Sequence, residues 1–182
     1  GVRVANGPSH VNIDGRWGAT IDLRWDADLR SLSLLNPDLD GELATTGHAR
    51  GSPARPEATG EARVRKLRYA GITVQSVEAV VDLDLGDRRE SNVDLRATEI
   101  DLGALALDSA TLTARGRTRE HAFELRFAST GDPDQGIPGF KAKLTADGDY
   151  EEGDRGWHGT LRETALVFQD DSADLLQPAA LE

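Results

Sequence analysis

The side chains of this chain that could do chemistry are its four histidines and its many hydroxyls and carboxylates. His10, His48, His121 and His158 are scattered, without the short spacings that metal ligands show. No serine lies in a Gly-x-Ser-x-Gly turn, and the chain has no cysteine to act as a nucleophile. Carboxylates occur on many segments, and nothing in the pattern marks a cleft that would gather two of them. We therefore expect no enzyme activity and no cofactor.

One segment begins like a calcium-binding loop. In Asn36–Gly41, oxygen-bearing side chains alternate and a glycine takes the sixth position. The twelfth position, where a bidentate glutamate is expected, is Gly47. A second candidate that starts at Asp132 also lacks its closing glutamate. Neither segment predicts a metal site.

The elements that would position these side chains are β-strands. In the segment 72–86, Glu78, Asp82 and Asp84 share one parity and are expected on a polar face. The residues of the other parity from position 77 onward are apolar, namely Val77, Ala79, Val81, Leu83 and Leu85. Because side chains alternate across a strand, the pattern makes one apolar and one polar face. A helix would instead spread the carboxylates around its circumference.

The same alternation recurs along nearly the whole chain and predicts an all-β fold of about ten strands. The strands are joined by hairpin-length turns, as in an antiparallel meander. Only residues 28–35 carry leucines at a spacing of about three, which predicts at most one short helix there. The parity slips between Val64 and Leu67 and between Leu95 and Ile100, and each slip predicts a β-bulge.

Length and composition restrict the class of protein further. The 182 residues suffice for one domain or one segment of a longer chain, and the absence of methionine favours a piece of a larger protein. The formal charge of −11 argues against nucleic acid and anionic membrane surfaces as direct partners. No apolar run approaches the roughly 20 residues of a transmembrane helix.

A succession of leucine and glycine spacings follows the meander. A leucine-bearing turn precedes a Leu-x-Gly-x-Leu motif, spaced glycines, a proline and a strand that ends in Asp-Leu-Gly. These residues are Leu32, Leu35, Leu39, Gly41, Leu43, Gly47, Gly51, Pro56 and the segment 81–86. Similar units follow at 102–127 and 157–181. The succession resembles the periplasmic part of the TamB family, inner-membrane subunits of the translocation and assembly module that are related to AsmA-like bridge proteins.

The resemblance implies an elongated, curved and open half-pipe of β-sheet, or β-taco, with an apolar concave lining. Residues 1–182 would be a single segment of this longer, repetitive groove. It also implies a place in the periplasm of a Gram-negative bacterium, within a parent protein anchored in the inner membrane. The implied partners are phospholipid acyl chains, unfolded outer-membrane or autotransporter polypeptides, and a TamA-like outer-membrane barrel that other parts of the parent contact.

An open sheet of this size would expose more apolar surface than ordinary soluble proteins tolerate, and such a lining favours an acyl chain as ligand. The candidate lining residues of a lipid groove are Val11, Ile13, Ile21, Leu23, Trp25, Leu43, Val64, Leu67, Val77, Val81, Leu83, Leu85, Val93, Leu95, Phe123, Leu125, Phe127, Phe140, Leu144, Trp157 and Leu161.

Three other interpretations remain open at this point. The same apolar residues could form the core of a closed sandwich or barrel that has no groove. An outer-membrane barrel would need aromatic girdles, which two tyrosines and three tryptophans do not supply. A scaffold that binds client polypeptides by adding a strand to a sheet edge is the main functional alternative.

Overall fold

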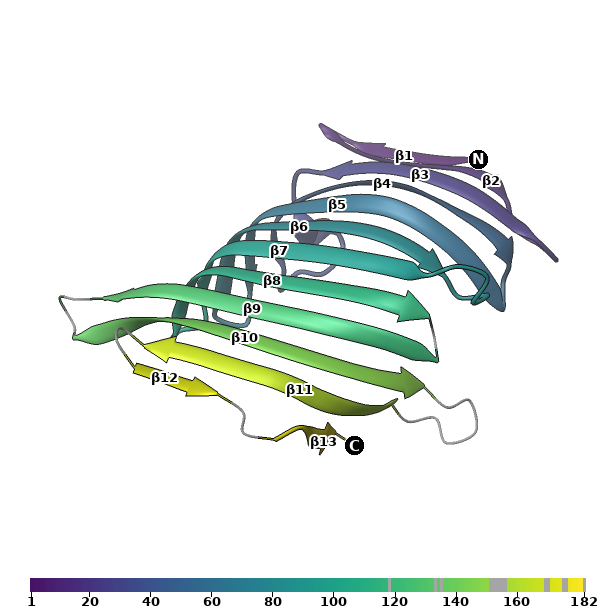
Figure 1. The fold of residues 1–182 in the computed structure, drawn as a ribbon. Helices are drawn as coiled ribbons and strands as arrows, with labels where there is room; N and C mark the ends of the chain where they lie inside the picture. The colour runs from purple at the N-terminus through teal and green to yellow at the C-terminus, as the bar shows by residue number, and fades with distance from the viewer. Residues whose placement is uncertain are drawn as a thin grey trace.

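A computed structural model of the protein describes residues 1–117, 119–132, 134, 136–150, 157–168, 171–174 and 177–181. The described elements are strands and one 3₁₀ turn (Figure 1). They are β1 (Val2–Asn6), β2 (Ser9–Arg16), β3 (Ile21–Leu29), η1 (Leu32–Leu34), β4 (Asp40–Ser52), β5 (Arg55–Tyr69), β6 (Ile72–Asp84), β7 (Ser91–Asp101), β8 (Ala106–Arg117), β9 (Glu120–Asp132), β10 (Ile137–Tyr150), β11 (Trp157–Phe168), β12 (Asp171–Asp174) and β13 (Ala179–Leu181).

The strands form one antiparallel sheet in which spatial order follows chain order from β1 to β12, while β13 pairs with β11. This confirms the predicted all-β meander. The sheet has 13 strands rather than about ten, because β1, β12 and β13 are short strands of three to five residues. The predicted helix is the three-residue turn η1. In the described part, no helix is long and apolar enough to cross a membrane.

The sheet is open. Among the described residues, β1 pairs only with β2, and the strands at the other end pair only with β11. The closed sandwich or barrel is therefore wrong as an interpretation of this part of the chain. Figure 1 shows the sheet curling so that the strands enclose a concave side.

The curl is concentrated on one line across the strands. At this line the pairing between neighbouring strands skips one residue on each strand and then resumes in the same register. The skipped residues are Lys66 in β5, Gln75 in β6, Glu99 in β7 and Asp108 in β8. Lys66 and Glu99 have φ angles of 52° and 49°, in the left-handed region that residues other than glycine rarely adopt. Both lie where the sequence predicted bulges. The pairing of β4 with β5 also shifts register between Asp40 and Glu42, opposite the first of them.

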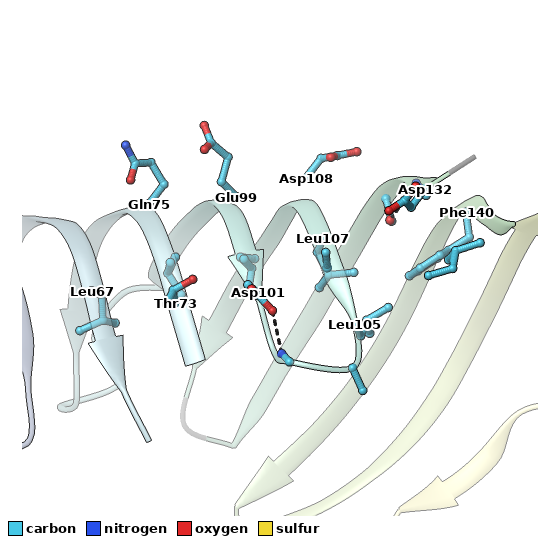
Figure 2. A pocket seen from close by; sticks show the side chains of 18 of the residues that line it. Leu67, Thr73, Gln75, Glu99, Asp101, Leu105, Leu107, Asp108, Asp132 and Phe140 are labelled. Carbon is cyan, nitrogen blue, oxygen red and sulfur yellow. Dashed lines mark hydrogen bonds between the residues drawn. The ribbon is translucent and has the colours of Figure 1, made fainter. Parts of the chain in front are cut away.

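Beyond this line the strands turn sharply, as Figures 1 and 2 show. We call residues 67–74 and 100–107 the short arm. In Figure 2, Gln75 and Glu99 point away from the bend on its outer side, whereas Leu67 and Leu107 point into it. An extra outward residue on each strand therefore keeps the apolar side chains on the inner side through the turn.

A compact apolar cluster holds the bend. Val74, Ala97, Ile100 and Leu107 are buried, each with 7–8% of its surface exposed. Partly buried side chains from both sides of the bend pack against them, namely Leu67, Val77, Ala110, Phe127 and Phe140. Since Ala97 and Ile100 lie on opposite sides of Glu99, the cluster fixes the angle between the short arm and the rest of the sheet.

The sequence predicted Asp84 on a polar, solvent-facing surface, but its side chain is buried. It ends β6 with only 1% of its surface exposed. Its carboxylate accepts the backbone N–H groups of Gly86 and Arg89 at 2.8 and 3.2 Å and lies 3.5 Å from the guanidinium of Arg88. Burial raises the pKa of Asp84, but these donors outweigh it and hold the pKa below its ordinary value of 3.8. The residue closes the β6–β7 turn.

Candidate functional site

The concave face is lined by apolar residues that stand opposite one another across neighbouring strands. Following the strand pairing, they form rows that cross the sheet. The first row, next to the bend, is Leu29, Leu43, Val64, Val77, Ala97, Ala110, Phe127 and Ala142. The second row is Val11, Ala27, Thr45, Ala62, Ala79, Leu95, Leu112, Leu125 and Leu144. The third row is Ile13, Trp25, Gly47, Gly60, Val81, Val93, Ala114, Phe123 and Ala146.

Most of this face is neither buried nor fully exposed. Of the 21 residues predicted as lining, seventeen are half-buried. Ile21 is buried at 6% exposure, and Ile13 is 38% exposed. Leu85 lies just past β6 and is 50% exposed, although its N–H still donates to the carbonyl of Pro56. The side chain of Trp157 lies outside the described residues. Within the described part, no second layer covers the face.

The concave side continues inside the bend, where the predicted lining residues Leu67 and Phe140 meet Val74, Ile100 and Leu107, which were not predicted. A hollow of about 1260 Å³ lies there, with Leu67, Val74, Ile100, Leu107 and Phe140 among its walls (Figure 2). The parity slips hid Val74, Ile100 and Leu107, because a residue on the short arm returns to the inner face only after the extra outward residue. The slip at 95–100 was the signal that could have located them.

Two carboxylates around this hollow are engaged in the local structure. Asp101 accepts the N–H of Gly103 at 2.7 Å and so stabilises the β7–β8 turn. Asp108 accepts the N–H of Thr130 at 2.6 Å, which ties β8 to β9 where their ladder ends. These two carboxylates therefore accept hydrogen bonds from backbone N–H groups and stabilise the local fold.

Trp25 forms the aromatic part of the lining. An added Cβ would lie 2.0 Å from Cζ2 of the indole at Gly47 and 3.1 Å from it at Gly60. The ring therefore lies flat across β4 and β5, over two positions that have no side chain. Its Nε1 donates to Oγ1 of Thr45 at 3.2 Å. The glycines give the indole a place on the concave surface that larger residues would block.

The outer face carries charged pairs between neighbouring strands. Arg63 donates to Glu78 at 2.9 Å, and Lys143 donates to Glu163 at 2.8 Å. Arg162 holds the pKa of the Asp147 carboxyl below its ordinary value through a charge-assisted hydrogen bond. These side chains are largely exposed, so each pair stabilises the sheet little and mainly keeps its outer face polar.

The side chains that the sequence offered as candidates for metal binding or catalysis make structural hydrogen bonds and ion pairs. Asn36 accepts the N–H of Asp38 at 2.9 Å in a turn, and Asp40 pairs with Arg68. His10 and His48 bond to Asp26 and to another aspartate of β3, at 2.7 and 2.8 Å. Across the described residues, no group of three histidine, cysteine or acidic side chains is placed to hold a metal ion.

The fold and this face define a class of protein: an open antiparallel meander whose one apolar face lines a concave groove. Residues 1–182 match the family described as TamB, N-terminal domain. The chain therefore belongs to the TamB N-terminal domain family. No solved structure matches the chain.

Membership of this family confirms the resemblance drawn from the leucine and glycine spacings. It implies a TamB-type role, an envelope-associated place in the periplasm, and association with a TamA-like partner. The family is a transport and assembly module and is not known for enzymatic activity.

Proposed function

We propose that the concave face shields the acyl chains of phospholipids while they cross the periplasm. In this proposal residues 1–182 are one segment of a longer groove that bridges the inner and outer membranes. The parent protein is anchored in the inner membrane, supports the assembly of outer-membrane proteins, and meets its TamA-like partner through other parts.

The observation that carries the proposal is an apolar lining left accessible on an open sheet. Three rows of mostly aliphatic and aromatic side chains cross the sheet, one from β3 and two from β2, and all three reach β10. Burying on the order of a dozen methylenes there would gain roughly 10 kcal/mol, at about 0.8 kcal/mol each, before ordering costs are subtracted. An acyl chain supplies this many methylenes and needs no polar anchor in the groove.

Trp25 provides a direct test, because its indole lies on the proposed lipid surface. Phospholipids with brominated acyl chains should quench its fluorescence, measured with Trp17→Phe and Trp157→Phe in place. Leu125→Arg puts a charge in the second row and should reduce quenching severalfold. Val80→Arg, on the outer face at a position that is 52% exposed, should not. Equal quenching in the two arginine variants, with both folded by circular dichroism, would argue against the groove.

Photo-crosslinkers give an independent readout. Placed at Leu83, Leu125 or Phe127 they should capture phospholipid, whereas one at Lys143 on the outer face should not. Capture at all four positions alike would indicate nonspecific adsorption and contradict the proposal.

A second candidate function is supported by the sheet edge. β1 pairs only with β2 in the described part, and Val2 and Val4 are 61% and 58% exposed. An unfolded outer-membrane polypeptide could add a strand at this edge. A photo-crosslinker at Val4 should then capture such a client, and one at Val80 should not. Absence of capture at Val4 would leave the lipid groove as the better proposal.

A further inference from the structure

The sheet splits beside the bend. β8 and β9 pair only as far as Ser109 and Ala128, and beyond this point β8 turns into the short arm while β9 continues. The hollow of about 1260 Å³ is bordered by residues from both sides of the split, and we call it the bend hollow. Figure 2 shows Leu105 and Leu107 on one side of it and Phe140 on the other. The bend hollow therefore has two walls, whereas the open part of the concave face has one.

Large apolar side chains that the fold leaves exposed border this hollow. Leu105 lies just before β8 and is 40% exposed, and Phe168 ends β11 and is 39% exposed. The ring of Phe168 packs against that of Phe140, with the two centroids 5.7 Å apart. Leu105 shares a face with Leu107, two residues on, and Phe140 shares the face of the first-row residue Ala142. Exposed apolar groups from distant parts of the chain thus meet around one hollow, which favours an apolar ligand.

The bend hollow is long in the direction across the strands. Its lining comes from every strand from β5 to β11. Six strand spacings of about 4.8 Å correspond to roughly 29 Å along the sheet. One acyl chain spans about 15 Å, half of a hydrocarbon core about 30 Å thick. Pockets that hold drug-sized ligands have about 300–1,000 Å³, so both the length and the volume of the hollow suffice for such a chain.

A chain in the bend hollow loses more contact with water than a chain elsewhere on the concave face. On the second and third rows the protein covers a chain from one side only. In the hollow, the short arm covers it from one side and the ends of β9, β10 and β11 from another. The apolar free energy grows with the area removed from water, so the hollow is the most favourable position on this face.

Other occupants suit the bend hollow less well. Its lining includes four acidic and two basic residues, and the basic residue Arg68 already pairs with Asp40. This balance disfavours a phosphate group inside the hollow. A polypeptide that ran across the strands could not pair its backbone N–H and C=O groups with theirs, and each unpaired buried group costs free energy. An acyl chain has no such groups.

We propose that one acyl chain of a phospholipid lies lengthwise in the bend hollow, across the strands, between the short arm and the ends of β9, β10 and β11. The proposal rests on the lipid-groove function and specifies the position and direction of its ligand. The chain would lie along the direction in which the strands stack. This is the direction in which a longer groove would continue.

The test places a single tryptophan in the bend hollow. Phe168→Trp is combined with Trp17→Phe, Trp25→Phe and Trp157→Phe, so that only the new indole fluoresces. Phosphatidylcholine with brominated acyl chains should quench it, and the lipid concentration at half-quenching gives the affinity. This lipid has no net charge, so the acidic chain does not repel it.

Leu105→Asp and Leu102→Asp form a matched pair of variants. Both leucines flank the β7–β8 turn and are similarly exposed, at 40% and 44%, but Leu102 is not among the residues that line the hollow. Leu105→Asp should weaken lipid binding about tenfold, which corresponds to two methylenes that lose their apolar contact. Leu102→Asp should change the affinity by less than about twofold.

A second reporter tests the direction of the chain. Leu67→Trp, in the same background, is on β5, and Phe168→Trp is on β11. Leu105 lies about three strand spacings, or about 14 Å, from each of them along the sheet. Because one acyl chain spans this distance, Leu105→Asp should weaken the binding that either reporter measures. Tyr69→Trp, two residues farther on the same face, replaces Leu67→Trp if circular dichroism shows that the latter does not fold.

Each other outcome overturns the proposal in a distinguishable way. If brominated lipid quenches neither Phe168→Trp nor the native Trp25, the lipid-groove function itself fails. If it quenches Trp25 alone, or if the two aspartate variants weaken binding equally, the groove stands and the bend hollow is not the chain site. If Leu105→Asp leaves the binding at one reporter unchanged, the chain does not lie across the strands. If Phe168→Trp responds to an unfolded outer-membrane polypeptide and not to lipid, the hollow is a polypeptide site.

Discussion

Replacing Leu107 with alanine should loosen the bend that shapes the groove. The side chain is 7% exposed and belongs to the cluster between the short arm and the rest of the sheet. Removing three buried carbons at about 0.8 kcal/mol each lowers the free energy of unfolding by roughly 2–3 kcal/mol. The cavity contribution is small, because the vacated space opens into the hollow under the bend and fills with water.

Leu105 provides a matched control two residues away. It has the same side chain but is 40% exposed, so Leu105→Ala should lower the free energy of unfolding by only about 1 kcal/mol. Urea titration followed by circular dichroism gives both values, with an unchanged slope in urea expected for each. Hydrogen exchange in residues 67–74 and 100–107 should accelerate in Leu107→Ala specifically. Equal losses in the two variants would refute the claim that this cluster holds the short arm.

Three further predictions test particular residues. Because the pKa of Asp84 is lowered in the folded state, its stabilisation is complete above the ordinary value of 3.8 and is lost as the pH falls below it. In urea titrations between about pH 5 and pH 2, Asp84→Asn should therefore lose less stability than the unmodified chain, and parallel losses would contradict this role. Gly47→Ala should displace the indole above it, shift tryptophan emission to the red and cost about 1–3 kcal/mol, whereas Gly18→Ala, with open space around it, should do neither. Lys66→Val should lower the free energy of unfolding by about 1–2 kcal/mol because a β-branched residue resists a φ of 52°, and Lys66→Gly should not lower it; equal losses would mean that the left-handed backbone is not what matters there.

The strands and their facing were predictable from the sequence because they depend on local alternation. The alternating segment that includes Glu78 became β6, and the two parity slips located the interruptions at Lys66 and Glu99. The slips did not show that the interruptions would align across four strands. That alignment depends on the register between strands, which the pattern within a single strand does not contain. The alignment decides where the sheet bends.

Asp84 shows a second limit of reading alternation. The pattern placed it on a polar face, but the backbone of the following turn wraps around its carboxylate. An Asp two residues before Gly86, at the end of a strand, is typical of a turn. The prediction from alternation gave this signal no weight.

The order of the strands has a consequence for how the molecule is built. Each strand from β2 to β11 pairs with the strands next to it in the chain, so contacts are made between successive hairpins. Stability in such an arrangement is approximately a sum of nearest-neighbour terms, as in solenoid proteins. Folding can begin at any hairpin and spread by zippering in both directions. Two strands could be inserted or removed at a turn, and the remaining register would survive, so that evolution can adjust the reach of the molecule hairpin by hairpin.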